Sequence, residues 1–279
     1  MTEYLRPRDL DEAVTARAAH PDWMVLAGGT DLMVNANHRV VPAGIVDLWR
    51  LAELCFVHVG DAITIGAGTT WSEVEHHPAI RERLAPLALS AREIGALQIQ
   101  ARGTLGGNVG TSSPVGDSLP ALLALDAELE VASVRGRRRV PYREWCTGYR
   151  TTKLAPDELI VAAHVPIPDA ATRTTWRKVG TRRAQSISKV MGAAAITLDG
   201  DTVVSARVAL GAVANRPIRI AAVEDAVRGQ RLGQAADAAR AAVRASIQPI
   251  DDIRSTSVYR REVAENLVAR FFTPAGGVS

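Results

Sequence analysis

The chain carries two successive patterns of apolar residues, and these restrict its fold more than any single motif does. In the first half, short apolar runs alternate with segments of helical periodicity. From residue 159 onward, apolar and polar residues alternate in four runs, as in an antiparallel sheet: 159–165, 174–179, 193–198 and 203–212. The chain has 279 residues, about twice the usual domain length, so two domains are expected. The stretch 166–171 (PIPDAA) is the natural boundary between them.

Local signals predict most elements of the first half. The pair Gly60-Asp61 separates two β-rich runs and favours a hairpin of 56–59 with 62–65. Thr70 and Glu73 have the spacing of a capping box, so a helix is expected to begin there. The remaining predictions are a strand over 23–27, a helix opening in 31–37, a helix over 78–95, a glycine-rich loop over 103–116, a helix over 119–125 and a strand over 127–134.

The second half is expected to end in helices. Asp199-Gly200-Asp201 is a strong hairpin signal between the last two alternating runs. Alanine-rich helical segments follow Pro217. A final helix over 257–272 would place three apolar residues on one face, namely Val263, Leu267 and Phe271.

The composition is that of a globular chain. Hydrophobic residues make up 47% and charged residues 23%, which excludes a disordered chain or a fibre. No run of eighteen apolar residues occurs that would span a membrane. The first ten residues (MTEYLRPRDL) lack the hydrophobic stretch of a signal peptide. A cytoplasmic protein without a membrane span is therefore expected.

The basic pI of about 9.1 does not by itself indicate a nucleic-acid partner. The net charge is only +3, and no helix-turn-helix, aromatic RNA-binding or zinc-finger motif is present, so no such partner is expected. Basic residues gather around Gly136, at Arg135, Arg137, Arg138 and Arg139. A solvated hairpin turn is the preferred interpretation, and a surface that docks a partner stays open.

Several catalytic and metal-binding patterns are missing. Gly66-x-Gly68 lacks the third glycine of a dinucleotide-binding fingerprint, and there is no phosphate-binding P-loop or nucleophile elbow. The six histidines have no metal-ligand spacing, so no metal site is expected. Two cysteines, Cys55 and Cys146, are too few for a disulfide framework or an iron–sulfur cluster held within this chain.

Two glycine pairs, each with polar flanks, are the strongest candidates for ligand binding. Ala27-Gly28-Gly29-Thr30-Asp31 follows an apolar strand, and Thr104-Leu105-Gly106-Gly107-Asn108 lies in the longer glycine-rich segment. Consecutive glycines allow close backbone approach, and their N–H groups can form an anion-binding concavity. Two facing loops would suit the two charged groups of a pyrophosphate. The alternative is that each pair forms only a tight turn.

Asp117 closes the second glycine-rich segment. A carboxylate beside a phosphate loop would repel the ligand unless it accepts hydrogen bonds from sugar hydroxyls. Its simpler interpretation is an N-cap for the helix at 118–125, and the two roles are compatible.

These segments resemble the FAD-binding subunits of the molybdenum hydroxylases, a family that includes the medium subunit of aerobic carbon monoxide dehydrogenase and the flavin domain of xanthine dehydrogenase. The resemblance rests on AGGTDL at 27–32, GTLGGN at 103–108 and SPVGD at 113–117. It continues through Thr147–Ile160, WRKVGTRRAQSISKV at 176–190 and STSVYRR at 255–261, so it spans nearly the whole chain.

The resemblance implies an α+β protein in two domains. Residues 1–168 would form an FAD-binding domain like that of vanillyl-alcohol oxidase and p-cresol methylhydroxylase (PCMH), with subdomains of about 1–55 and 56–168. Residues 169–279 would form a C-terminal α+β domain with a three- or four-stranded antiparallel sheet and helices.

The resemblance also implies roles for individual residues. The FAD pyrophosphate would be held by Ala27, Gly28, Gly29, Thr30 and Asp31 together with Thr104, Leu105, Gly106, Gly107 and Asn108. Asp117 would meet ribityl or ribose hydroxyls, and Ile94 and Gly95 would pack against the adenine. Ile160, Lys178 and Tyr149 would lie near the flavin ring and its polar edge, where a lysine supplies a suitable positive charge. A plain surface lysine is the alternative for Lys178.

One departure from the family pattern concerns Gln100-Ala101, where Arg-Asn commonly precedes the GT-x-GGN motif. It puts in doubt the contacts around that turn or the docking of an iron–sulfur partner.

The family's function is an electron relay through FAD. The resemblance implies an oxidoreductase subunit that receives electrons from iron–sulfur clusters in a small subunit, with molybdopterin in a large subunit, and passes them to an acceptor. No residue of this chain would need to act as a catalytic acid or base. The alternative is a stand-alone FAD-dependent oxidase or monooxygenase. Such an enzyme could also be a homodimer. A non-catalytic module would require vestigial FAD loops, and the intact loops argue against that.

Overall fold

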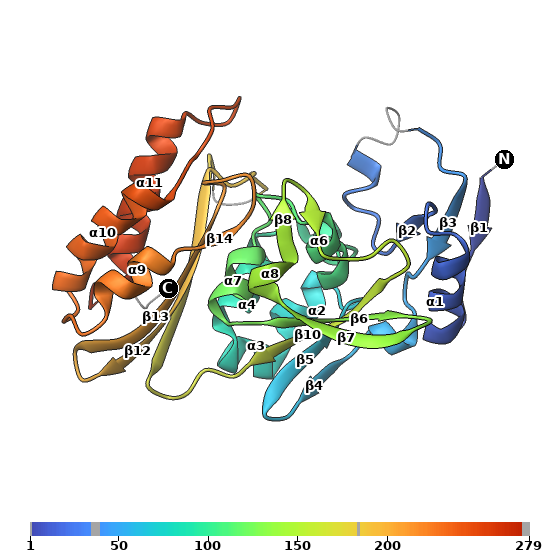
Figure 1. Ribbon diagram of the computed structural model, residues 1–279, viewed down its shortest axis with the longest axis horizontal. Coiled ribbons are helices and arrows are strands. Elements are labelled where there is room, and N and C mark those ends of the chain that lie inside the picture. Colours follow the sequence, from blue (N-terminus) through green and yellow to red (C-terminus); the bar gives the residue numbers. More distant parts are fainter. Residues whose placement is uncertain (1, 35–39, 183–184, 275–279) are drawn as a thin grey trace.

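Three layers of sheet and helix follow one another along the long axis of the molecule (Figure 1). A computed structural model describes residues 2–34, 40–182 and 185–274. The N-terminus lies at one end of the long axis, and the C-terminal helices lie at the other. Within the described residues, no helix is both long and apolar enough to cross a membrane.

The N-terminal layer is a three-stranded parallel sheet in the order β1-β3-β2. Its elements are β1 (Glu3–Leu5), α1 (Leu10–Ala19), β2 (Met24–Leu26), β3 (Gly44–Asp47) and a short 3₁₀ helix (Ala52–Leu54). Because β2 and β3 are parallel, the segments that follow them leave the sheet at the same edge. In the helix predicted over 31–37, residues 31–32 form a turn and 33–34 a 3₁₀ turn, and 35–37 lie outside the described residues.

The central layer is a five-stranded sheet in the order β4-β5-β10-β6-β7. Its strands are β4 (Val57–Val59), β5 (Ala62–Gly66), β6 (Glu128–Ser133), β7 (Gly136–Pro141) and β10 (Leu159–Pro166). A small hairpin of β8 (Cys146–Gly148) and β9 (Thr151–Thr152) lies beside it. The helices are α2 (Trp71–His76), α3 (Pro78–Arg83), α4 (Ala85–Glu93), α5 (Leu97–Gln100), α6 (Leu105–Thr111), α7 (Leu119–Ala124) and α8 (Tyr142–Trp145).

Two local predictions in this layer are confirmed and one is wrong. The β4–β5 hairpin forms, and Thr70 and Glu73 make both bonds of the capping box at α2. The single helix predicted over 78–95 is instead two helices, α3 and α4, separated at Leu84. Pro86 explains the break, because its ring would clash with the carbonyl one turn earlier if the helix continued.

The C-terminal layer is a four-stranded antiparallel sheet in the order β11-β12-β13-β14, where a sheet of three or four strands was expected. Its strands are β11 (Thr172–Val179), β12 (Val190–Asp199), β13 (Thr202–Gly211) and β14 (Ile218–Arg219). The predicted turn at Gly200 is present, with a φ of +56°. The helices that follow are α9 (Ala221–Val227), α10 (Gln234–Ser246) and α11 (Ser257–Phe271).

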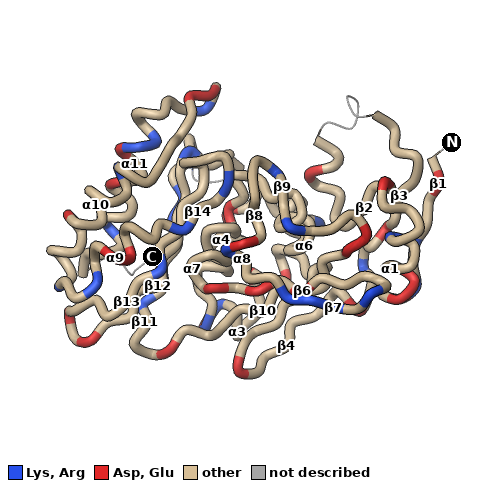
Figure 2. The backbone as a smooth tube through the Cα atoms, viewed as in Figure 1, with Lys and Arg blue, Asp and Glu red and all other residues tan. Residues whose placement is uncertain are grey.

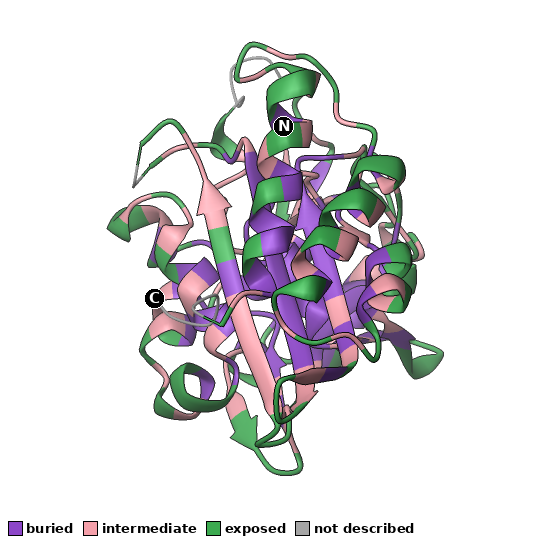
Figure 3. Ribbon diagram, turned by 90° about the vertical axis from the view of Figure 1, so that its left-hand side faces the viewer, coloured by how far each residue is buried: buried purple, intermediate pink, exposed green. Residues whose placement is uncertain are grey.

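The sheet of the C-terminal layer has buried residues on both faces. Trp176, Ala193 and Ala209 belong to the core of the central layer, where α4 and α7 pack against β11, β12 and β13. Neighbours of opposite parity, such as Ala194 and Val208, face the helices α9–α11. Figure 3 shows the result as buried strands behind helices whose outer faces are exposed. The C-terminal sheet therefore packs against the central layer with one face and against the helices α9–α11 with the other.

The arginine-rich stretch is the predicted hairpin, formed by β6 and β7 with Gly136 at a φ of +113°. In Figure 2 the backbone tube along β7 carries the colour of basic residues. Each has an acidic partner: the pairs are Arg135–Asp157, Arg137–Glu130, Arg138–Glu158 and Arg139–Glu128. The local positive charge is thus neutralised by carboxylates of the same chain.

Arg260 joins α11 to the sheet, and its side chain is only 2% exposed. It donates to the carbonyls of Lys189 and Ala212 and to the carboxylate of Asp252 at 2.7 Å. Burial alone would raise the pKa of Asp252, but backbone N–H groups of Arg254 and Ser255 and the Arg260 guanidinium lower it from 3.8 to about 2.

We predict that Arg260→Met destabilises the protein by about 3 kcal/mol, because it leaves buried carbonyls and a carboxylate without their donor. Urea unfolding at neutral pH measures this. Since the folded-state pKa of Asp252 is depressed, its contribution to stability is present above pH 3.8 and is lost as the pH falls toward about 2. The variant should show a shallower loss of stability over that interval. An unchanged pH dependence would contradict the assignment.

Candidate FAD-binding site

The first glycine loop leaves the carboxyl edge of the parallel sheet directly after β2. Gly29 has a φ of +77°, and a Cβ atom on Gly28 would overlap the carbonyl oxygen of Arg102. Within the described residues, the N–H groups of Gly28, Gly29 and Thr30 have no hydrogen-bond acceptor. A partly accessible loop with unused donors of this kind fits an anionic ligand.

The second glycine pair has a different structure from the predicted loop. The segment predicted as a loop over 103–116 contains the helix α6, and Thr104 is its N-cap. The N–H groups of Leu105–Asn108 already donate at 2.8–3.0 Å, to oxygens of Ala67, Thr69 and Thr104. These donors are therefore satisfied within the protein, because the pair falls in the first turn of a helix that is itself anchored to the preceding segment.

The exposed surface of α6 still offers ligand contacts. Gly107 is exposed, and an added Cβ would meet only the Thr104 hydroxyl, at 3.0 Å. The side-chain oxygen of Asn108 accepts from Ser118 at 2.7 Å, which leaves the amide NH₂ to donate elsewhere. This segment is thus suited to close contact through Gly107 and to one side-chain donor.

The structure brings the two glycine segments together. The backbone of Gly28 lies against Arg102, and the Thr30 hydroxyl lies close to Gly103, just before α6. Arg150, at the β8–β9 turn, forms an ion pair with Asp31 at 3.3 Å. The segments 27–31 and 103–108 are therefore neighbours, as binding of one ligand by both would require.

Asp117 lies in a buried cluster at the interface of the central and C-terminal layers. Its carboxylate accepts from Lys178 Nζ at 2.6 Å and from the Ser188 hydroxyl at 2.5 Å. Lys178 also donates to the carbonyl of Glu93 at 3.2 Å, and its side chain is 5% exposed. Burial raises the pKa of Asp117, and this effect outweighs the lowering by Lys178 and Ser188.

Two alternatives considered for this cluster are wrong. Asp117 does not cap the following helix, because Ser118 occupies the N-cap position without a side-chain bond and the Asp117 side chain points to β11 and Ser188. Lys178 is not a surface lysine.

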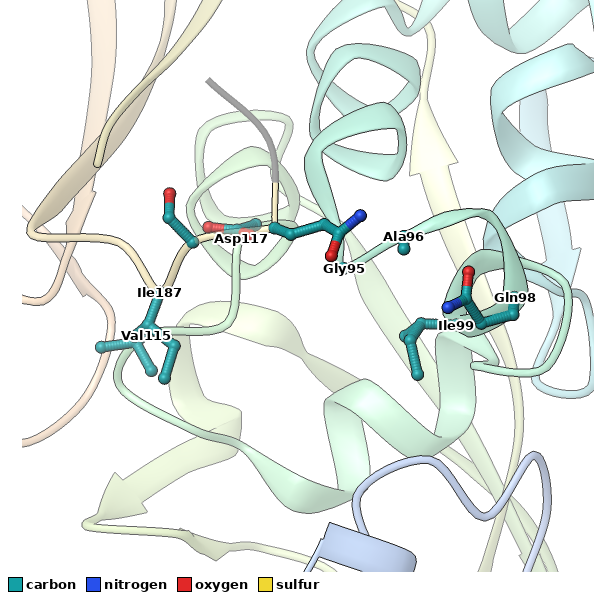
Figure 4. A pocket seen from close by; sticks show the side chains of 9 residues that line it. Gly95, Ala96, Gln98, Ile99, Val115, Asp117 and Ile187 are labelled. Carbon is teal, nitrogen blue, oxygen red and sulfur yellow. The ribbon is translucent and has the colours of Figure 1, made fainter. Parts of the chain in front are cut away.

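A cavity of about 330 Å³ opens beside Asp117. Figure 4 shows Val115 and Ile187 on one side of it and Gln98 and Ile99 on the other. Gly95, with a φ of +59°, also lines it. The segment between β11 and β12, which carries Ile187 and Ser188, therefore contributes to the site together with the central layer.

The other predicted residues are more dispersed. Ile94 is the partly buried C-cap of α4, and Ile160 on β10 is 9% exposed and adjoins Gly110 of α6. Tyr149 is 65% exposed at the β8–β9 turn, next to the arginine that reaches Asp31. No contact described here joins Tyr149 to Lys178, although both were expected near the same edge of the flavin.

Gln100-Ala101, which replaces the Arg-Asn common in the family, packs at the end of α4. Gln100 is 4% exposed, and its side-chain amide donates to the carbonyl of Arg92 near the end of α4 at 2.9 Å. Ala101 is exposed. An uncharged donor thus satisfies a helix terminus at the position where the family commonly has arginine.

Residues that sequence reasoning missed include Ser188, Trp49 and Arg102. Ser188 belongs to the basic stretch 176–190, but no local pattern links a serine to a carboxylate 71 positions away. The ring of Trp49, just after β3, lies 3.8 Å from the guanidinium carbon of Arg102. The one signal in the sequence that could have pointed to Trp49 as a site residue is its position after the carboxyl end of a strand, where ligands often bind.

Fold and site together describe a flavoprotein, and comparison with known proteins gives its family. Residues 1–168 match the family described as the FAD binding domain in molybdopterin dehydrogenase, and residues 176–275 match the CO dehydrogenase flavoprotein C-terminal domain. The chain belongs to this family of FAD-binding subunits of molybdopterin dehydrogenases. The predicted family, α+β fold, FAD cofactor and oxidoreductase class are thereby confirmed.

Relatives match over almost their whole length. The chain is 32% identical to the glyceraldehyde dehydrogenase medium chain of Sulfolobus acidocaldarius, with 96% of each chain covered. It is 29% identical to the nicotinate dehydrogenase FAD-subunit of Eubacterium barkeri, over 97% of this chain and 94% of that one. A solved carbon monoxide dehydrogenase of Hydrogenophaga pseudoflava superposes with a TM-score of 0.92 at 30% identity, covering 96% of this chain and 95% of that one.

We predict that Asp117→Ala destabilises the protein by about 3–5 kcal/mol, because it leaves the Lys178 ammonium buried without a partner. The double variant Asp117→Ala/Lys178→Met should regain much of this loss. Urea unfolding of the four proteins in the cycle gives the coupling.

Glu144→Ala is the matched control, because it breaks an ion pair with Lys153 whose side chains are 45% and 44% exposed. It should change stability little. An Asp117→Ala protein as stable as this control would show that the pair does not hold the interface.

Proposed function

We propose that this chain is the FAD-binding electron-transfer subunit of a heteromeric molybdenum hydroxylase. The observation that carries the proposal is the loop at Gly28–Thr30, whose three N–H groups have no acceptor among the described residues and which lies against the segment leading into α6. The relatives' names support the rest, since they are FAD subunits or medium chains of dehydrogenases.

Bound FAD would supply the redox chemistry, taking electrons from one partner and delivering them to another. The chain's own residues would bind and orient it. Gly28, Gly29 and Thr30 would donate N–H groups to the pyrophosphate, and Asp31 would stay neutralised by Arg150. Gly107 and Asn108 would contact the same group from α6. The remaining residues proposed for this part of the site are Ala27, Thr104, Leu105 and Gly106.

The cavity beside Asp117 would take another part of the cofactor. Asp117 can accept from sugar hydroxyls, and Lys178 places a cation 2.6 Å from that carboxylate. Ile94 and Gly95 at the end of α4, Ile160 on β10 and Tyr149 at the β8–β9 turn are proposed to contact FAD as well. No residue is assigned to acid or base catalysis.

The assembly, location and domain division are part of the proposal. We expect a small iron–sulfur subunit and a large molybdopterin subunit as partners, in the cytoplasm. The division at 1–168 and 169–279, with a subdivision near residue 55, agrees with the change from one sheet to the next along the chain.

The first test is the visible absorption spectrum of the purified protein, before and after incubation with FAD and desalting. A retained flavin spectrum is the expected result. Native mass then separates a complex of unlike subunits, which the proposal requires, from a lone monomer or homodimer that oxidises a small molecule. The latter outcome would replace the proposal with a stand-alone flavoenzyme.

We predict that Gly107→Val abolishes FAD retention, because its branched side chain would project from the exposed surface of α6 into the space of the pyrophosphate. Flavin content after desalting is the measurement, and circular dichroism should show an intact fold.

Gly60→Val, in the β4–β5 turn, is the matched control, because a Cβ there would meet its nearest atoms at 3.7 and 3.9 Å. This control should keep its flavin. Normal flavin content in Gly107→Val would count against the placement of the site.

A further inference from the structure

Arg102 lies directly beside the first glycine loop. It connects α5 to α6, and its carbonyl oxygen occupies the place that a side chain on Gly28 would need. Its Nε lies 3.4 Å from the carbonyl oxygen of Gly28. The guanidinium carbon lies 3.8 Å from the centre of the Trp49 ring, which follows the neighbouring strand β3. Two contacts from the N-terminal layer, one after β2 and one after β3, thus hold this cation at the edge of the parallel sheet.

The charge of Arg102 is not neutralised by a described carboxylate. No described acidic group lies within ion-pair distance of it, and no acceptor among the described residues pairs with its terminal nitrogens. The arginines of the β6–β7 hairpin differ, because each of them has an acidic partner, as does Arg150. Within the part of the chain that the structure describes, Arg102 therefore has an uncompensated charge and unused terminal donors.

Stacking explains how such a charge can be held in place. An arginine on an aromatic face keeps its N–H groups free in the guanidinium plane, which suits the oxygens of a phosphate. A lysine at this position would lack both the planar stack and the paired donors. The Trp49 ring thus holds the guanidinium against the loop that carries Gly28, whose N–H group and those of Gly29 and Thr30 have no acceptor among the described residues.

We propose that Arg102, oriented by Trp49, is a phosphate-binding residue of the cofactor site and makes the site selective for the pyrophosphate-containing dinucleotide over uncharged riboflavin. This rests on the proposed function, because it assigns one more contact to the same ligand. Neutral N–H groups alone would bind a doubly charged group without neutralising it, and Arg102 supplies the missing charge.

The test is a titration of the purified assembly, with whatever subunits co-purify and with its flavin removed, against FAD and against riboflavin, followed by quenching of flavin fluorescence. Arg102→Gln should weaken FAD binding about 10- to 100-fold, the range for one hydrogen bond to a charged group. Riboflavin affinity should stay unchanged. The FAD affinity of the variant should also depend less on salt than that of the native protein.

Companion variants keep the test decisive if Arg102→Gln folds poorly. Arg102→Lys keeps the charge and should lose part of the affinity. Trp49→Phe should retain most of it and Trp49→Leu should lose more, because only an aromatic face supports the stack. Arg81→Gln, an exposed arginine on α3, is the control with the same charge change.

The outcomes separate the two proposals. If the native protein binds FAD and the Arg102 variants bind it equally well, the role of Arg102 is overturned and the FAD subunit assignment stands. Equal weakening of FAD and riboflavin would also overturn it, because it would indicate a structural effect. Absence of FAD binding by the native assembly would overturn the proposed function and this inference with it.

Discussion

The buried pair of Asp117 and Lys178 connects the parts of the molecule on which the site depends. Trp176 and Lys178 are two residues apart on β11, so they point to the same side, and both reach Asp117: Trp176 donates to its carbonyl at 3.0 Å and Lys178 to its carboxylate. Ser188 adds a third bond from the segment before β12. A buried ion pair adds little net stability over an apolar contact, but loss of one partner leaves an uncompensated buried charge. Here the pair joins the C-terminal sheet to the central layer beside α4 and α7 and borders the cavity.

The two glycine segments show what a sequence motif can and cannot predict. AGGT and LGGN look equivalent as strings, and their convergence on one site was predictable from the resemblance. The backbone conformations and hydrogen bonds of the two segments were not predictable, because they depend on where a helix begins. Gly28 and Gly29 lie after β2, outside any helix or strand, and their N–H groups have no acceptor among the described residues, whereas Gly106 and Gly107 fall inside α6 and donate to the protein. Such local signals as the Thr70 capping box were predictable because both partners lie within one turn.

Charge was harder to interpret from sequence than the strand pattern was. The alternation along 159–212 predicted the antiparallel strands because burial on a sheet face imposes a period of two. The sequence positions of clustered arginines, by contrast, do not indicate which acidic residues will pair with them. Arg138 is neutralised by Glu158, twenty positions later and on another segment, while Arg102 stands beside glycines and has no described acidic partner. Only the fold separates a structural cation from one available to a ligand.

The site therefore divides its tasks between two regions of different physical character. At the carboxyl edge of the parallel sheet, backbone donors and a stacked arginine form a polar, partly accessible surface that is suited to bind an anion. At the interface of the layers, Asp117 and Lys178 are buried and bear on stability as well as on the ligand. A substitution of the exposed Arg102 can thus weaken cofactor binding and spare the fold, whereas one at the interface alters both. Flavin affinity and stability should therefore change independently along one part of the site and together along the other.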